Sequence, residues 1–205
     1  MKNKLLIIGA SGHGKVVADI AIKMNQWKSI EFLDDDPTKK MSLGLKVIGC
    51  TKNLFDYTDN YDIFVAVGDN EIRKELFKKL VEVGASIPIL VHPSAIIGEY
   101  VKIGYGTVVM AGTVVNCCTE IGEGCIINTG STIDHDNFIG CFVHISPGVH
   151  LAGEAKVGND SWLGIGSIVS NNINITSGCK IGAGAVVVKN IMNPGVYVGV
   201  PVRRI

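Results

Sequence analysis

From Val91 onward the sequence repeats with a period of six, and this repeat constrains the fold more than any other feature of the chain. Seventeen consecutive hexads, with no insertion between them, each begin with Ile, Val or Leu. The fifth position of each hexad is small or β-branched almost throughout, and the second position is usually small. An α-helix has 3.6 residues per turn, so a period of six would spread the aliphatic side chains around its axis. Short strands joined by tight turns can keep them on one side.

The period therefore predicts a parallel β-helix built from hexapeptide repeats. Each hexad supplies one strand and one corner, and three hexads close a triangular coil of about 18 residues. Seventeen hexads make between five and six such coils, with the aliphatic positions stacked inside. We expect the β-helix to span residues 91–192. The tail, residues 193–205, is expected to cover the open end of the stack, as terminal repeats must.

Residues 1–90 follow a different pattern, in which apolar runs alternate with segments of helical spacing. We expect strands at residues 4–9, 29–36 and 62–70, and a fourth at 86–91. Amphipathic helices are expected at 16–24 and 71–84, the second one ending at Gly84. Alternation of strand and helix at this length predicts a small parallel α/β domain of Rossmann-like type.

Composition excludes some classes of protein. Lys+Arg and Asp+Glu both number 19, so the zero net charge argues against a nucleic-acid-binding protein. No apolar stretch reaches the roughly 18 residues of a membrane span, and the apolar run near the N-terminus is too short for a signal peptide. The six cysteines include no Cys-x-x-Cys pair, which favours reduced thiols and a cytoplasmic protein over a zinc site or a disulfide framework.

A glycine-rich segment, GASGHGKV (residues 9–16), follows the first expected strand and opens the first helix. Such a turn lets the backbone approach a ligand, and the N–H groups of a helix N-terminus suit phosphate. Val16 stands where a P-loop needs Ser or Thr for Mg²⁺, so ATP hydrolysis is not expected. Acidic residues 34–36 end the second strand and Gly-Asp-Asn (68–70) ends the third, which together predict a nucleotide site. The alternative is a set of ordinary tight turns.

Three of the five histidines lie within STIDHDNFIGCFVHISPGVH, residues 131–150. None of them occupies the inward hexad position, and His144 and His150 fall on different faces of a triangular coil. A zinc site within one chain is therefore not expected. Asp134 and Asp136 flank His135, and a neighbouring carboxylate can orient an imidazole that accepts a proton. The sequence favours proton transfer by His135, and a polar turn without function is the alternative.

The chain resembles the nucleotide-activated amino-sugar N-acetyltransferases, related to sialic acid O-acetyltransferases, on GASGHG, LDDD, VGDNEIRK, INTGSTIDHDNFIGCFVHISPGVHLAG and GVYVGVP. The resemblance covers nearly the whole chain. It implies a left-handed β-helix, a homotrimer with its active sites between neighbouring β-helices, acetyl-CoA as co-substrate, no metal, and a UDP-linked 4-amino sugar as acceptor. The left hand of the coil comes only from the resemblance.

The resemblance also implies roles for individual residues. His135 matches the general base, and Asp136 matches the carboxylate that raises its basicity. The residues implied for substrate binding are Ser11, Gly12, His13, Asp34, Asp35, Gly68, Asn70 and Asn128. Those implied for acetyl-CoA are His144, Gly153, Ile165 and Ala183.

Other readings remain open from the sequence. A sialic acid O-acetyltransferase would use the same histidine base on a hydroxyl group, and a GDP-linked amino sugar could replace the UDP-linked one. A non-catalytic nucleotide-sugar sensor would keep GASGHG and LDDD but would not need Asp-His-Asp. A zinc hydratase on the same scaffold would need a metal site.

Overall fold

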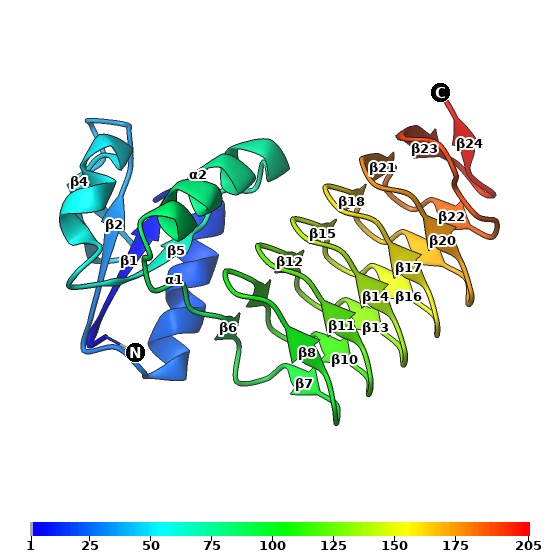
Figure 1. Cartoon of the computed structure of the whole chain (residues 1–205), viewed down its shortest axis with the longest axis horizontal. Helices are drawn as coiled ribbons and strands as arrows, with labels where there is room; N and C mark the ends of the chain where they lie inside the picture. Colours follow the sequence, from blue (N-terminus) through cyan, green and yellow to red (C-terminus); the bar gives the residue numbers. More distant parts are fainter. Residues whose placement is uncertain (1) are drawn as a thin grey trace. The chain divides into compact units, whose positions relative to one another are not determined.

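The computed structural model describes residues 2–205 and contains two compact units, the first ending at Pro93 and the second beginning at Ser94 (Figure 1). The domain boundary expected after residue 90 lies a few residues before this point. In the first unit, five strands form a sheet of order β3-β4-β2-β1-β5. The elements of this unit are β1 (Lys4–Ile8), α1 (Gly12–Met24), β2 (Ser29–Leu33), β3 (Met41–Ser42), β4 (Leu45–Gly49), a 3-10 helix (Thr51–Tyr57), β5 (Asp62–Val65), α2 (Asn70–Glu82) and β6 (Leu90–Val91).

The centre of this sheet is parallel, because β1 pairs in parallel with both β2 and β5. Apart from Lys4, the residues of β1 are fully buried. Parallel strands of one sheet end at the same edge, so the loops after β1, β2 and β5 lie near one another. Gly14 packs against the loop after β1 so closely that a Cβ there would lie 1.8 Å from the carbonyl oxygen of Gly9.

The structure differs from the expectations for this unit in several places. The strands expected at 29–36 and 62–70 end at Leu33 and Val65, and the first helix begins at Gly12 instead of residue 16. The segment 86–91 was expected to be a strand, but only Leu90–Val91 is one. Pro88 lacks the N–H that a strand interior needs, which accounts for the interruption. The hairpin of β3 and β4 was not expected, because Met41–Ser42 and Leu45–Gly49 are short and show no clear alternation.

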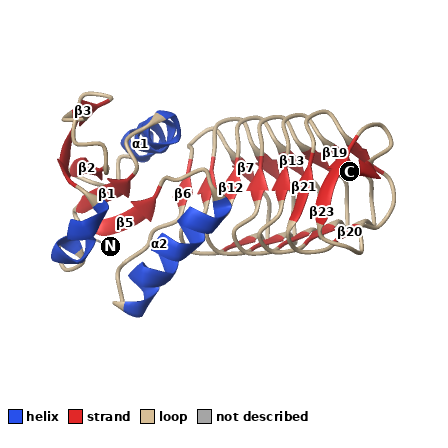
Figure 2. Cartoon of the chain, turned by 90° about the horizontal axis from the view of Figure 1, so that it is seen from above, coloured by secondary structure: helices blue, strands red, loops and turns tan. Residues whose placement is uncertain are grey.

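The second unit is a parallel β-helix of three faces (Figure 2). The register steps by 18 residues, so that Val114 pairs with Ile96 on one side and with Thr132 on the other. The first face holds β7 (Ile96–Ile97), β10 (Val114–Val115), β13 (Thr132–Ile133), β16 (His150–Leu151), β19 (Ile168–Val169) and β22 (Val186–Val187). The second holds β8 (Lys102–Ile103), β11 (Glu120–Ile121), β14 (Phe138–Ile139), β17 (Lys156–Val157) and β20 (Asn174–Ile175). The third includes β9 (Val108–Val109), β12 (Ile126–Ile127), β15 (His144–Ile145), β18 (Trp162–Leu163), β21 (Cys179–Ile181), β23 (Gly195–Val198) and β24 (Arg203–Arg204).

The inside of the coils is filled by the first and fifth positions of each hexad, as the repeat predicts. From Val109 onward every first-position residue is at most 4 % exposed. Several fifth-position hydroxyl groups bond between coils. Thr107 Oγ1, for example, donates to the Gly122 carbonyl at 2.8 Å and accepts from the Cys125 N–H at 3.0 Å. At the C-terminal end, β23 continues the third face beside β21, and β24 pairs with β23. The tail thus extends the third face, and its residues Gly199 and Val202 also form backbone hydrogen bonds with Val186 on the first face.

The three corners of the coil differ in which residues occupy the left-handed backbone region. The corner between the third and first faces, here called the glycine corner (turns 110–113, 128–131, 146–149, 164–167 and 182–185), has glycine at every such position. The corner between the first and second faces, here called the His135 corner (turns 98–101, 116–119, 134–137, 152–155 and 170–173), has none. Its left-handed residues are Tyr100, Cys118, Asp136, Glu154 and Asn172. This conformation costs a residue with a Cβ roughly 1–2 kcal/mol, so side chains are kept at this corner against a local cost.

Candidate functional site

A cavity of about 300 Å³ opens where the loops after β1, β2 and β5 meet in the N-terminal unit. Five of the residues implied for the nucleotide lie on it, namely Ser11, His13, Asp34, Asp35 and Gly68. Gly12 and Asn70 do not line it, although each begins the helix that follows one of these loops. Gly12 begins α1 with open space around it. The remaining wall is mostly apolar, including Ile8, Ile72 and Leu76, and Thr51 adds a hydroxyl group.

Asp34 is largely occupied by bonds within the protein. Its carboxylate accepts from the Ala10 N–H at 2.7 Å and the Asp36 N–H at 3.0 Å, and it pairs with Lys39 Nζ at 3.1 Å. Partial burial works in the opposite direction, but these bonds hold the pKa of Asp34 below its usual value. Lys39 also donates to Ser11 Oγ at 2.8 Å. Asp34 therefore stabilises the glycine-rich turn and holds the Lys39 ammonium group beside Ser11. Lys39 was not identified from the sequence.

Asp35 binds the start of the 3-10 helix, since Thr51 donates to it from both its N–H and its hydroxyl at 2.8 Å. Asn70 has a comparable structural task in the third loop. Its side-chain oxygen accepts from Arg73, whose guanidinium also donates to the carbonyls of Val67 and Gly68. The buried Arg73 thus fixes the loop that carries Gly68 on the cavity wall.

His13 is neutral at physiological pH. Burial, with a smaller contribution from the positive charge of Arg73, lowers its pKa to about 4. Its Nε2 atom is buried and has no hydrogen-bond partner in the protein. An imidazole in this state at the wall of a largely apolar cavity offers a hydrogen bond to a bound molecule without adding charge.

The His135 corner carries the second candidate site. His135 Nδ1 lies 2.8 Å from Asp136 Oδ2, and the two side chains are 50 % and 56 % exposed. The hydrogen bond that His135 donates to Asp136, together with the charges of Asp134, Asp136 and Glu154, raises the pKa of His135 above its usual value despite some opposing desolvation. Because Nδ1 holds the carboxylate, Nε2 is the nitrogen that can exchange a proton with a ligand.

Gly153 forms a wall against this imidazole. A Cβ at Gly153 would lie 2.7 Å from both Cε1 and Nε2 of His135. The same turn position carries Cys117, His135 and Asn171 in neighbouring coils, so glycine is needed here for the ring and not for the turn itself. The sequence-based assignment of Gly153 to acetyl-CoA did not include this packing role.

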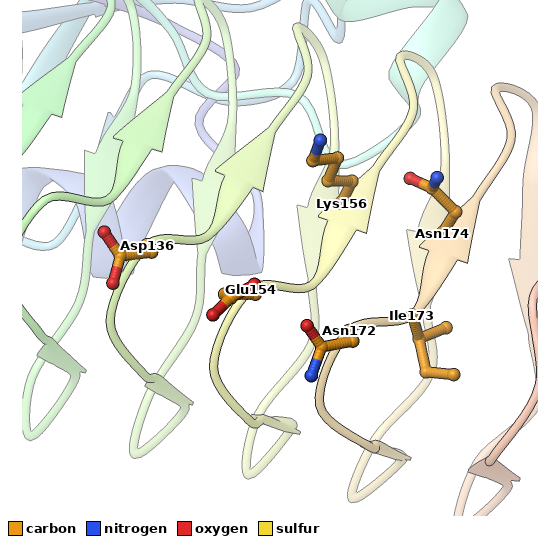
Figure 3. Close-up of a pocket in the computed structure, with 6 residues that line it drawn as sticks. All are labelled: Asp136, Glu154, Lys156, Asn172, Ile173 and Asn174. Atoms are coloured by element: carbon orange, nitrogen blue, oxygen red, sulfur yellow. The ribbon is translucent and has the colours of Figure 1, made fainter.

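Side chains of the His135 corner also line a hollow of about 560 Å³ (Figure 3). Asp136, Glu154 and Asn172 follow one another at the same turn position of successive coils, with Lys156 and Asn174 on the adjoining strands (Figure 3). The hollow is therefore polar and lies directly beside the histidine–aspartate pair. Glu154 was not identified from the sequence, although its 18-residue offset from Asp136 would have placed it there.

The glycine corner and the strand β15 that leads into it carry most of the residues implied for acetyl-CoA. Asn128 Nδ2 lies 3.3 Å from His144 Nε2, and the His144 ring stacks on Trp162 with centroids 5.4 Å apart. An apolar hollow of about 290 Å³ next to Trp162 is lined by Ile165 and Ala183. Trp162, which donates to Ser146 at 2.8 Å, was not identified from the sequence because outward aromatic residues on a strand have no specific signal.

Within one chain these residues form two groups on different corners of the coil. His135, Asp136 and Gly153 lie on the His135 corner, whereas Asn128, Ile165 and Ala183 lie on the glycine corner and His144 lies on β15, the strand that leads into it. Among residues 2–205, no group of three or more His, Cys, Asp or Glu side chains is arranged to hold a metal ion. No helix in this part of the chain is long and apolar enough to cross a membrane.

Comparison with known proteins places this geometry in a family. The family described as PglD N-terminal domain matches residues 4–80. The UDP-N-acetylbacillosamine N-acetyltransferase of Bacillus subtilis (strain 168) is 34% identical over 117 residues, which make up 54% of this chain and 52% of that protein. The alignment thus spans about half the length of this curated relative.

Solved structures match over the whole chain. The acetyltransferase domain of PglB from Neisseria gonorrhoeae FA1090 has a TM-score of 0.97 and 40% identity, and the match covers 100% of both chains. The same domain has also been solved in complex with acetyl coenzyme A. PerB from Caulobacter crescentus, in complex with CoA and GDP-perosamine, has a TM-score of 0.92 and 35% identity over 98% of this chain and 96% of that chain.

These matches confirm the family and the fold expected from the sequence, including a left-handed parallel β-helix after a small α/β domain. The family members are acetyl-CoA-dependent sugar N-acetyltransferases. The chain belongs to the nucleotide-sugar N-acetyltransferases of the left-handed β-helix fold.

Proposed function

We propose that this protein transfers the acetyl group of acetyl-CoA to the 4-amino group of a UDP-linked amino-dideoxy sugar, with His135 as the general base. The observation that carries the proposal is the bond between His135 Nδ1 and Asp136, which leaves Nε2 to receive a proton. The family relationship supports the co-substrate, and the name of the Bacillus relative supports a UDP-linked amino sugar.

The proposed reaction is a direct attack on the thioester. The amine nitrogen forms a bond to the acetyl carbonyl carbon, and one of its protons passes to His135 Nε2. Asp136 stabilises the imidazolium that results. The carbon–sulfur bond then breaks, and CoA leaves as a thiolate that takes up a proton, so the products are an amide and a free thiol. No cysteine acts as a nucleophile in this scheme.

The acetyl donor is assigned to the glycine corner. We propose that the pantetheine arm lies along this corner, against Ile165 and Ala183, and that His144 lies beside the thioester. Glycines with open space around them, such as Gly148 and Gly166, leave room for a linear chain there. The Gly153 N–H is assigned to the developing oxyanion, for which one such donor is worth roughly 2.7–4 kcal/mol.

The active site needs a second copy of the chain in this proposal. Base and acetyl donor are assigned to different corners of one coil, and a neighbouring subunit can bring the glycine corner of one chain to the His135 corner of another. A homotrimer with three such clefts fits a triangular β-helix. Cross-linking or light scattering would measure the assembly.

The nucleotide is assigned to the cavity of the N-terminal unit, where Ser11, His13, Asp34, Asp35 and Gly68 line the wall. A GDP-linked amino sugar is the second candidate, because PerB, 35% identical, was solved with GDP-perosamine. Gly12 and Asn70 are assigned to shaping the loops around the ligand.

The test is release of CoA thiol from acetyl-CoA, with a UDP-4-amino-4,6-dideoxy sugar, its GDP counterpart and a free sialic acid offered separately. Turnover with the UDP sugar alone is the expected result, and turnover only with sialic acid would overturn the proposal. Replacing His135 with alanine should abolish nearly all turnover and leave the assembly intact. An active variant would exclude His135 as the base.

A further inference from the structure

We infer that Asn137 is the residue that positions the catalytic turn, by fixing the backbone that carries His135 against the next coil. The inference rests on the proposed role of His135 as the base. Asn137 occupies the fifth, inward position of its hexad, where it is 2 % exposed. Asn137 is not expected to touch the substrate, so its effect on the reaction would pass through His135.

The side-chain amide of Asn137 holds three carbonyls and one N–H. Its nitrogen donates to Asp134 O at 2.7 Å, Ala152 O at 3.1 Å and His135 O at 3.3 Å. Its oxygen accepts from the Ala155 N–H at 3.1 Å. Two of these groups belong to the turn of His135, and two belong to the turn of the next coil that carries the Gly153 wall. This buried side chain therefore adds to the backbone bonds between the two turns, such as the one from Glu154 N–H to His135 O at 3.0 Å, and binds both the turn of the histidine and the turn of that wall.

Other polar residues at the fifth position are hydroxyls, and chemistry limits what they can do. Thr119, one coil earlier at the same corner, donates to Asp134 O at 2.8 Å and accepts from the Asn137 N–H at 3.2 Å. A hydroxyl has one hydrogen, so it serves one carbonyl at a time, whereas an amide has two hydrogens and a separate acceptor. Asparagine is thus the side chain that can hold its own turn and the next coil together.

Burial strengthens the hydrogen bonds of the Asn137 side chain. Hydrogen bonds away from water are stronger, and a network in which every member is satisfied rigidifies its surroundings. The ring of His135 is itself half exposed and has Gly153 on one side. Its placement therefore depends on the backbone of residues 134–137 more than on packing around the ring.

The decisive variant is Asn137→Thr, because the fold already accepts threonine at this position of the preceding coil. Threonine keeps one acceptor and one donor hydrogen, and loses the second N–H that spans the two turns. We expect kcat to fall roughly 10- to 100-fold while KM for both substrates stays within about twofold, since misplacement of about 1 Å can cost that much rate. The pKa of His135, followed by NMR titration, should fall toward its ordinary value as the Asp136 bond loosens.

Thr107→Ala is the matched control. It removes the side-chain bonds to Gly122 and Cys125 between coils at the corner of the second and third faces. It should lower the melting temperature by at least as much as Asn137→Thr and leave kcat and the His135 titration unchanged. A purely structural role of Asn137 would make the two variants behave alike.

The outcomes separate this inference from the proposed function. If the wild type turns over, His135→Ala is inactive, and Asn137→Thr keeps wild-type kcat and His135 titration, the inference is wrong and the proposed function stands. If His135→Ala remains active, the proposed function fails. The NMR titration of Asn137→Thr then still decides whether Asn137 sets the surroundings of His135, since an unchanged pKa would overturn that too.

Discussion

Replacing Gly153 with alanine should displace the imidazole of His135 and leave the fold intact. The added Cβ would lie 2.7 Å from Cε1 and Nε2, whereas ordinary van der Waals contact begins at 3.4 Å, so the ring must retreat by at least about 0.7 Å. The backbone of Gly153 is outside the left-handed region, and His135 and Asn171 carry side chains at the same turn position of adjacent coils. Alanine is therefore compatible with the turn.

The size of the effect follows from this displacement. A retreat of this size stretches the 2.8 Å bond from Nδ1 to Asp136 and moves Nε2 away from the attacking amine. Misplacement of about 1 Å can reduce a rate roughly 100-fold, which corresponds to about 2.7 kcal/mol in the activation barrier. Steady-state measurement of CoA release should show lower kcat with little change in melting temperature. Asn171→Ala, the control in the next coil, should retain activity. A Gly153→Ala enzyme with wild-type kcat would refute the argument that this wall sets the position of the base.

Three further predictions address charge and stacking. Asp136→Asn should lower kcat and move the acid limb of the pH–rate profile to lower pH. His135 works as a base only when neutral, and the variant loses the carboxylate that raises the pKa of His135. A profile that does not move would contradict this. The unfolded chain protonates His13 near pH 6.5 and the folded one only near pH 4, so stability should be lost between these values, by up to about 3 kcal/mol. Denaturant unfolding of wild type and His13→Gln at pH 7 and pH 4.5 would measure it, and an equal loss in both would count against His13. Trp162→Ala should raise KM for acetyl-CoA roughly tenfold by removing the surface on which His144 stacks, and titration calorimetry showing unchanged affinity would exclude that role.

The β-helix was predictable because its interactions are periodic. Each strand pairs with the residues 18 positions away, so one rule read from the hexads specifies the strand pairing of the coil. The α/β unit was less predictable, because its contacts are not periodic. The segment 86–91 has the apolar composition of a strand, and only Leu90–Val91 forms one. The hairpin of β3 and β4 is held by pairing with β2, which no local pattern reveals.

The sequence could indicate which residue types at turns were candidates, but it could not predict which atoms those side chains contact. Asp34 stands where a ribose-binding carboxylate is expected, yet its oxygens bind Ala10, Asp36 and Lys39. Lys39 gave no signal, because one lysine in a polar loop is common. Asn137 was visible only as a large polar side chain at a position otherwise small or β-branched.

The sequence by itself determined the period of six, the inward aliphatic columns and the division into an α/β unit and a β-helix, because these depend on short-range spacing. It also determined that His135 has a carboxylate as its neighbour in the chain. Only the tertiary structure decided that Gly153, 18 residues away, is the wall against which the imidazole lies, and that Asn137 joins the two turns. It also decided that the His135 and His144 groups lie on different corners. Side-chain contacts between coils depend on the conformation of each corner, which the residues of one turn do not encode.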